Sequence, residues 1–315
     1  MIGHILVPLD GSQTAERALR HGALLARTLD ADLTLARVPE PTVVPVMSGA
    51  VWVTEEVGSQ RALEEAERYL ASVAERPELN GVRVATVTPG HPVATGLLQT
   101  VEQHGVDLVV ITTHGYAGFK RWVFGSVADK LIGSASVPVY VVREDNDTAP
   151  APPALQTVLV PLDGSTLAET ALDSAAFLAH RAGARVLLVQ VPTVPGFVTS
   201  IPETAGWIPR FLREQATEAA GYLAGKARAL ADAGLQVDSH VEVVTAGGVA
   251  DGILTSARRH DADVIVMSTH GRSGIGRWVF GSVADQVLRN ADRPVWLVRV
   301  RAEREGGAAA GNGGQ

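Results

Sequence analysis

Short apolar runs alternate along this chain with longer segments whose apolar residues recur at helical spacing. The run HILVPL at 4–9, for example, is followed by 12–29, in which leucine and alanine residues share one helical face. The pattern predicts strands at 4–9, 31–38, 81–88, 106–113 and 137–143, helices at 12–29, 59–76, 92–105 and 126–135, and a less regular stretch at 40–58. The same order of elements returns between residues 157 and 300.

The return of this order reflects a duplication that is visible in the letters themselves. LVPLDGS occurs at 6–12 and again at 159–165, and THGYAGFKRWVFGSVAD at 113–129 returns as THGRSGIGRWVFGSVAD at 269–285. A repeat of this length is a whole domain and not a solenoid unit. We therefore predict two tandem domains, 1–144 and 154–301. They are joined by the proline- and acid-rich linker 145–153, and a disordered tail, 302–315, follows them.

Continuous apolar strands that alternate with helices predict a parallel sheet covered on both faces. Each half is therefore predicted to be an α/β, doubly wound, Rossmann-like αβα sandwich with a five-stranded parallel sheet. Ligands of such sheets bind beyond the carboxyl ends of the strands. Asp10 and Asp163 follow the first strand of each half, and Thr112 and Ser268 end the fourth. If the first and fourth strands are neighbours, Asp10 and Thr112 line a crevice in the first domain, and Asp163 and Ser268 line one in the second.

Composition narrows the classes of partner. The chain of 315 residues is 46% hydrophobic and 19% charged, and its net charge is −7. This balance argues against nucleic acid and anionic membranes as the main partner. The absence of cysteine excludes disulfides and thiolate zinc sites, and the histidines show no ligand-like spacing, so an all-protein metal site is not expected. The first residues lack the pattern of a signal peptide, and we expect a cytoplasmic protein.

The repeated glycine segment has the chemistry of an anion site. Gly125 and Ser126 directly precede a predicted helix, whose first amides lack intrahelical partners and carry the positive end of its dipole. Phosphate oxygens fit such a site, and Gly281 and Ser282 repeat it. The alternative interpretation is a simple turn with Ser126 as the N-cap of the helix. Arg121 and Arg277, in RWVFGS, either reach phosphates or lie on the surface.

VPLDGS, then TTHG or STHG, then GSVAD and a closing PV-V-VR resemble the universal stress protein family, twice over nearly the whole chain. The nucleotide-binding branch of that family has the signature Gly, two residues, Gly, nine residues, Gly, then Ser or Thr. Gly115 with Gly125-Ser126 matches it, as does Gly271 with Gly281-Ser282. Both halves depart at the first glycine, which is Thr112 or Ser268. These side chains either crowd the nucleotide or hydrogen-bond it.

The resemblance implies an adenine nucleotide, ATP, as the ligand, and Mg²⁺ would arrive with it, held mostly by phosphate oxygens. It places the aspartates near the base and ribose, the valines after the second strands beside the base, and the prolines in the pocket wall. The expected binding residues are Pro8, Asp10, Val38, Thr112, His114, Gly115, Gly118, Gly125, Ser126 and Val127, and in the second half Pro161, Asp163, Val191, Ser268, His270, Gly271, Gly274, Gly281, Ser282 and Val283. For the two histidines, orienting the loop is favoured over catalysis, because no serine–histidine–acid set can be assembled from the sequence.

Three functions compete at this point. The first is a nucleotide-binding stress and signalling protein, in which ATP changes conformation or partner affinity. The second is a slow ATPase or nucleotide hydrolase. No general base, arginine finger or Walker-type lysine can be assigned, so at most weak hydrolysis is expected. The third is a structural paralogue that acts through protein partners.

The duplication also predicts how the two halves meet. Single-domain relatives generally pair through the edge near the last strand, so VPVYVVR at 137–143 and RPVWLVR at 293–299 are expected to pair within one chain as an internal pseudo-dimer. Further association of two chains into a homodimer, and the identity of protein partners, are left open by the sequence.

Overall fold

The computed structural model describes residues 2–40, 42–48, 51–57, 59–113, 125–143, 154–193, 208–244, 247–269 and 281–299, without the side chains of 42–48, 51–57, 208 and 209. All structural statements below concern these residues.

The first half alternates strands and helices as its hydrophobic pattern predicts. Its elements are β1 (His4–Pro8), α1 (Gln13–Leu29), β2 (Asp32–Ala36), β3 (Thr42–Ser48), β4 (Val51–Val57), α2 (Ser59–Ala74), the 3-10 turn η1 (Pro77–Leu79), β5 (Val84–Val87), α3 (Val93–Gln103), β6 (Leu108–Thr113), α4 (Ser126–Ser134) and β7 (Val139–Arg143).

The second half repeats this order. Its elements are β8 (Thr157–Pro161), α5 (Thr166–Glu169), α6 (Ala171–Ala182), β9 (Arg185–Gln190), α8 (Ile208–Asp232), β10 (Val237–Val241), α9 (Val249–Arg259), β11 (Val264–Ser268), α10 (Ser282–Asn290) and β12 (Val295–Val298). Its first helical segment is divided at Thr170, whereas α1 is continuous.

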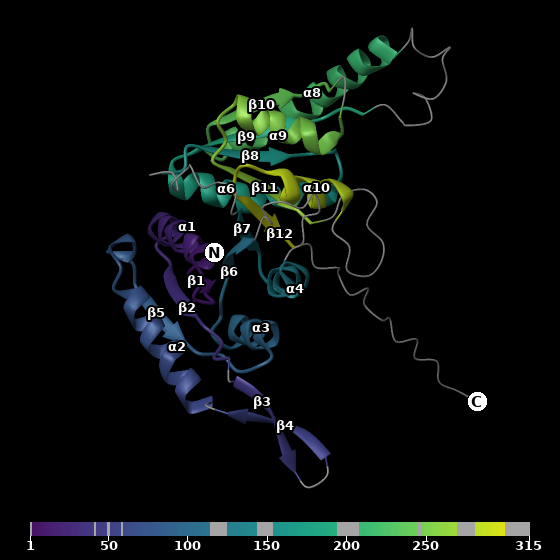
Figure 1. Ribbon diagram of the computed structural model, residues 1–315. Coiled ribbons are helices and arrows are strands. Elements are labelled where there is room, and N and C mark those ends of the chain that lie inside the picture. Colours follow the sequence, from purple (N-terminus) through teal and green to yellow (C-terminus); the bar gives the residue numbers. More distant parts are fainter. Residues whose placement is uncertain are drawn as a thin grey trace, which may run out of the picture.

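The sheet order is β10-β9-β8-β11-β12-β7-β6-β1-β2-β5, a single ten-stranded sheet to which each half contributes five strands (Figure 1). Within this sheet the strands of each half run parallel, and β12 and β7 pair antiparallel where the halves meet. The predicted doubly wound fold is confirmed, and so is the pairing of the two last strands within one chain. This pairing covers one edge of each half sheet, as a closed two-fold interface requires.

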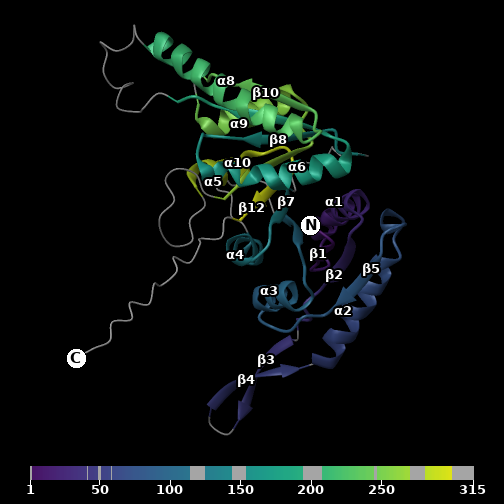
Figure 2. The ribbon, with the colours of Figure 1, turned by 180° about the vertical axis from the view of Figure 1, so that it is seen from behind.

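The core lies in two layers, one on each face of the sheet, and both layers continue across the two halves. Alternate side chains of each strand point to opposite faces. On β1, Ile5 and Val7 face the layer formed with α1, α2, α5, α6 and α8, while Leu6 faces the layer formed with α3, α4, α9 and α10. Figure 2, seen from behind, shows α1 and α6 as neighbours where the halves meet.

Side chains tie the halves together with approximate two-fold symmetry. Arg143 donates to the carbonyl of Ala291 at 3.1 Å, and Arg299 donates to the carbonyl of Ala135 at 2.7 Å. Each alanine is the C-cap of a helix, α10 or α4, where a cation is favourable. The repeated sequence therefore yields the same contact twice, once in each direction.

Aromatic rings fill the centre of this junction. Tyr140 of β7 and Trp296 of β12 are opposite each other in the sheet, fully buried, with ring centroids 6.1 Å apart in an edge-to-face arrangement. His21 of α1 lies against Tyr140, at 5.8 Å between centroids. Burial lowers the pKa of His21 to about 4, so the ring is neutral at pH 7.

The stretch 40–58, whose hydrophobic pattern is less regular, contains an antiparallel hairpin. Strands β3 and β4 pair from Thr42 with Val57 to Ser48 with Val51 and form a separate two-stranded sheet. The hairpin projects away from the ten-stranded sheet beyond α3 (Figure 1). Pro45, within β3, obscured the strand pattern, because proline is confined to edge strands.

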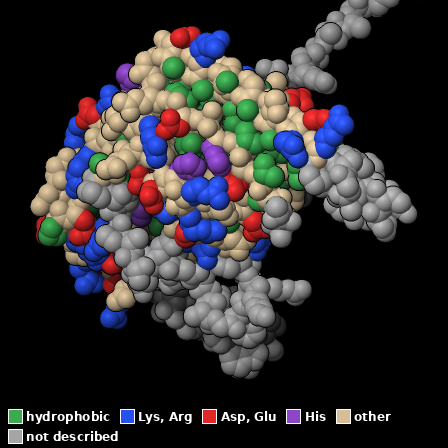
Figure 3. All heavy atoms as spheres, turned by 90° about the horizontal axis from the view of Figure 1, so that it is seen from above, with side chains coloured by type: hydrophobic (Ala, Val, Ile, Leu, Met, Phe, Trp, Pro, Cys, Tyr) green, Lys and Arg blue, Asp and Glu red, His purple; other side chains and the backbone are tan. Residues whose placement is uncertain are grey.

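The β10 end of the sheet carries charged side chains. Asp238 pairs with Arg185 at 3.0 Å, and the ring of His240 lies 4.9 Å from that of His260. Acidic, basic and histidine side chains stand side by side on this end of the molecule (Figure 3). Charges on an edge strand disfavour pairing with the edge of another sheet. Among the described residues, no helix has the length and apolar character needed to cross a bilayer.

Candidate functional site

The two predicted crevices lie where the sequence pattern placed them, beyond the carboxyl ends of adjacent strands. β1 pairs with β6, and β8 pairs with β11. The loop after the first strand of each half therefore faces the end of the fourth strand. Between these two strands the order of strands in the sheet changes direction. Doubly wound folds bind ligands at such a point.

In the first half this crevice is a cavity of about 240 Å³ between the β1–α1 loop, β6 and the start of α4. Seven of the residues expected from the sequence border it: Pro8, Asp10, Val38, Thr112, Gly125, Ser126 and Val127.

The equivalent cavity in the second half is larger, about 640 Å³. The corresponding seven residues border it: Pro161, Asp163, Val191, Ser268, Gly281, Ser282 and Val283. Six further residues expected at these sites lie outside the described residues, namely His114, Gly115, Gly118, His270, Gly271 and Gly274.

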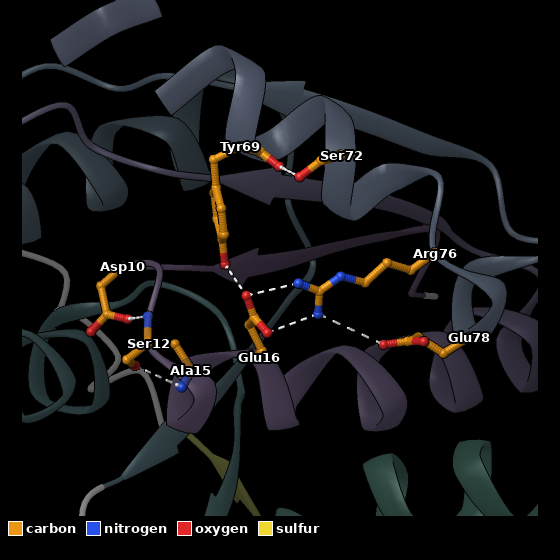
Figure 4. Close-up of polar contacts among 8 residues, drawn as sticks. All are labelled: Asp10, Ser12, Ala15, Glu16, Tyr69, Ser72, Arg76 and Glu78. Atoms are coloured by element: carbon orange, nitrogen blue, oxygen red, sulfur yellow. Dashed lines mark hydrogen bonds and ion pairs between the residues drawn. The ribbon is translucent and has the colours of Figure 1, made fainter. Parts of the chain in front are cut away.

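The repeated DGS motif shapes the loop beside each cavity. Asp10 accepts a hydrogen bond from the amide of Ser12 at 2.8 Å, and the hydroxyl of Ser12 in turn accepts from the amide of Ala15 and caps α1 (Figure 4). Gly11, between them, has φ of 89°, a left-handed conformation that glycine adopts freely. Each residue of DGS thus has a structural role, and together the three residues position the Asp10 carboxylate at the cavity.

The second half builds the same turn with one more contact. Asp163 accepts from both the amide and the hydroxyl of Ser165, at 2.9 and 2.6 Å, and Gly164 has φ of 81°. Ser165 caps α5 through the amide of Ala168. The aspartate is therefore oriented by its own loop in both sites.

The helix that follows the glycine segment presents its positive end to the cavity. Gly125 occupies the N-cap position of α4 and Ser126 the first helical turn, and no side chain caps this helix among the described residues. α10 begins in the same way at Gly281. The interpretation of Ser126 as the N-cap is therefore wrong. A helix start without a side-chain cap leaves its amides for an anion.

Space above Gly125 is open. A Cβ atom built on this residue would meet nothing within 4 Å, and its backbone, with φ of −56° and ψ of 144°, suits any residue. The turn itself does not require glycine here. The lack of a side chain matters instead for what approaches the helix from the cavity.

Thr112 and Thr113, at the end of β6, use their hydroxyls differently. Thr112 donates to the carbonyl of Thr14 at 2.8 Å, so its hydroxyl proton is used within the protein, between β6 and the start of α1. Thr113 borders the cavity, is 1% exposed, and its hydroxyl has no hydrogen-bond partner among the described residues. A buried hydroxyl without a partner is costly, and a polar ligand atom would satisfy it.

Sequence reasoning missed several groups that border the cavities. Thr113 adjoins the motif and was identifiable from TTHG. In the second half, Gln190 ends β9, and Gln215, Glu218 and Tyr222 come from α8. No local motif marks the α8 residues, because only packing of the helix over the sheet brings them to the cavity.

Known proteins share this architecture. The universal stress protein family model matches residues 1–143 and again 154–299. The chain belongs to the universal stress protein family. A universal stress protein of Mycolicibacterium smegmatis is 30% identical over 301 residues, which cover 94% of this chain and 97% of that protein. Universal stress protein YxiE of Bacillus subtilis is 29% identical over 148 residues, which cover 45% of this chain and 100% of that protein.

A solved structure shows the same tandem arrangement. The crystal structure of a universal stress protein from Archaeoglobus fulgidus superposes with a TM-score of 0.68 at 20% identity and covers 94% of this chain and 98% of that one. At this identity the likeness establishes the shared fold.

Proposed function

We propose that this universal stress protein binds an adenine nucleotide, ATP, beyond the carboxyl ends of its strands, and that occupancy changes its conformation or its affinity for protein partners. The observation that carries the proposal is the uncapped start of α4 and α10, open to a cavity, with an oriented aspartate opposite. The helix ends suit phosphates, and the carboxylates of Asp10 and Asp163 suit the hydroxyls of a ribose.

The donor set fits a magnesium nucleotide without a separate protein metal site. Among the described residues no group of three or more histidine, aspartate or glutamate side chains could hold a metal ion. Mg²⁺ would be held mainly by the phosphate oxygens, as is usual for this cation. The chain itself would supply amides, hydroxyls and carboxylates that bind and orient the nucleotide.

Calorimetric titration of the nucleotide-stripped full chain with ATP and Mg²⁺ tests the proposal. We expect binding by the natural chain and at least tenfold weaker binding by the double variant Gly125→Ala/Gly281→Ala, because each new methyl group stands at a helix start. The matched control is Gly225→Ala, on the exposed face of α8, where a Cβ also meets nothing within 4 Å. This control should bind as the natural chain does.

The same preparation separates the competing functions. Binding without phosphate release supports a nucleotide-dependent module, whereas steady phosphate release that disappears in the double variant would identify a hydrolase. Lack of binding by the natural chain would refute the proposal and leave a protein that acts through protein partners alone.

A further inference from the structure

The two cavities differ in a way that the near-identical motifs do not predict. The second cavity, about 640 Å³, lies within the range of roughly 300–1,000 Å³ typical of ligand sites, whereas the first, about 240 Å³, falls below it. The difference arises on the sheet face covered by α2 in the first half and by α8 in the second. Only the second cavity reaches that helix, at Gln215, Glu218 and Tyr222.

One substitution between the halves stands at the strand end that borders the second cavity. Val38 and Val191 occupy equivalent places after β2 and β9, so the residues before them, Arg37 and Gln190, are equivalent too. The guanidinium of Arg37 lies 4.4 Å from the centroid of the Tyr69 ring, on α2. It also lies against the first loop, since a Cβ built on Gly11 would stand 3.3 Å from its terminal nitrogens.

Arg37 thus lies between the β1–α1 loop and α2. Its guanidinium lies against Tyr69 and Gly11, whereas their equivalents, Tyr222 and Gly164, border the second cavity. The hydrogen bond of this tyrosine is alike in the two halves. Tyr69 donates to Glu16 at 2.8 Å, and Tyr222 donates to Glu169 at 2.8 Å (Figure 4 shows the first pair).

The cation beside Tyr69 and the cation beside Tyr222 come from different elements of the two halves. In the first half Arg37 comes from the strand end and covers the ring, while Arg76 pairs with Glu16 at 2.8 Å. In the second half Lys226, on α8, pairs with Glu169 at 2.7 Å and lies 5.7 Å from the ring centroid of Tyr222. Lys226 comes from the helix, and Gln190, at the strand end, is uncharged.

We propose that the second half carries the higher-affinity nucleotide site and that Arg37 closes the first. This inference rests on the proposed function. The added compartment, bordered by Gln190, Gln215, Glu218 and Tyr222, offers amide, carboxylate and phenol groups, and no described residue of this cavity carries a positive charge. It therefore suits the hydroxyl-bearing nucleoside end of the ligand, while the phosphates lie at the start of α10.

Reciprocal exchange of the two strand-end residues tests the proposal by calorimetry with ATP and Mg²⁺. The natural chain should bind one nucleotide per chain with high affinity. Arg37→Gln should add a second site, and Gln190→Arg should weaken binding at the second site at least tenfold. Matched controls are Arg61→Gln and Gln103→Arg, both on exposed helix positions, which repeat each change of charge away from the cavities.

Hydrogen exchange gives a second measurement that needs no variant. Added nucleotide should slow amide exchange in α8 and leave α2 unchanged. Two equal sites in the natural chain, with equal protection of α2 and α8, would overturn this inference and leave the proposed function intact. Weaker binding by Arg37→Gln would also overturn it, since Arg37 would then be a phosphate ligand. No binding by any of these proteins would refute the proposed function itself.

Discussion

Gly22, in the middle of α1, lies so close to β1 that any side chain at this position meets the core. A Cβ built on Gly22 would stand 2.8 Å from a methyl carbon of Val7 and 3.4 Å from one of Leu33. Both neighbours are fully buried, and valine is stiff about χ1, so the contact cannot be relieved by rotation. We therefore expect Gly22→Ala to destabilise the protein, although alanine is the better helix former.

The magnitude follows from two opposing effects. Overpacking of a close-packed core costs about 1–3 kcal/mol. Replacing glycine by alanine within a helix contributes about 0.8–1 kcal/mol in the other direction. The expected net loss is therefore about 1 kcal/mol in the free energy of unfolding. Ala175 stands at the equivalent place in the second half, where the helical segment is divided at Thr170.

Urea unfolding followed by circular dichroism measures this loss. Gly225→Ala, on the open face of α8, is the control and should gain up to about 1 kcal/mol from helix propensity alone. Val7→Ala removes the methyl group that the new Cβ would meet, so the double variant Gly22→Ala/Val7→Ala should be more stable than the sum of its single changes predicts. A Gly22→Ala protein as stable as the natural chain, or additive single changes, would refute this account of the packing.

Three further predictions concern the junction and the tie between α1 and α2. His21 has a pKa of about 4 in the folded protein against roughly 6.5 in the unfolded chain, so the unfolded chain binds more protons between these values. The free energy of unfolding should therefore fall by roughly 3 kcal/mol as the pH drops from 6.5 to 4. His21→Leu should flatten that part of the profile of urea midpoint against pH. Arg143→Ala and Arg299→Ala should each lower the free energy of unfolding by about 1.5–3 kcal/mol through loss of a charged hydrogen bond. A variant as stable as the natural chain would contradict the stabilising role of that hydrogen bond. Hydrogen bonding to Arg76 lowers the pKa of Glu16, so the stabilisation is present near neutral pH and is lost as pH falls through the lowered pKa. Arg76→Ala should therefore destabilise the protein at pH 7, and the difference in free energy of unfolding from the natural chain should shrink in acid. A difference that stays constant in acid would contradict the pairing of Arg76 with Glu16.

The sequence determined the fold class, the duplication and part of each cavity wall. Period-two and helical patterns are local properties, so strands and helices follow from them directly. DGS specified a turn for the same reason, because Asp10, Gly11 and Ser12 satisfy one another within three residues. The pairing of the last strands was also predicted, because the resemblance to the family implies pairing through the edge near the last strand.

The hairpin β3–β4 shows the limit of local reasoning. Its strands contain a proline and form outside the main sheet, so neither strand has the uninterrupted apolar pattern of the buried ones. The role of Ser126 has a similar origin. Glycine and serine together predict a helix start, but which of the two is the N-cap depends on backbone angles that the letters do not specify.

By itself, then, the sequence predicted two equivalent crevices, because the motifs that border them are contiguous and repeated. Only the tertiary structure decided that the two cavities differ in volume. Arg37 and Gln190 are single residues at equivalent strand ends, and nothing in the sequence says which way the longer side chain turns. Packing of α2 over the sheet sets the ring centroid of Tyr69 4.4 Å from the guanidinium of Arg37, a contact between distant segments, whereas the equivalent Tyr222 borders the second cavity.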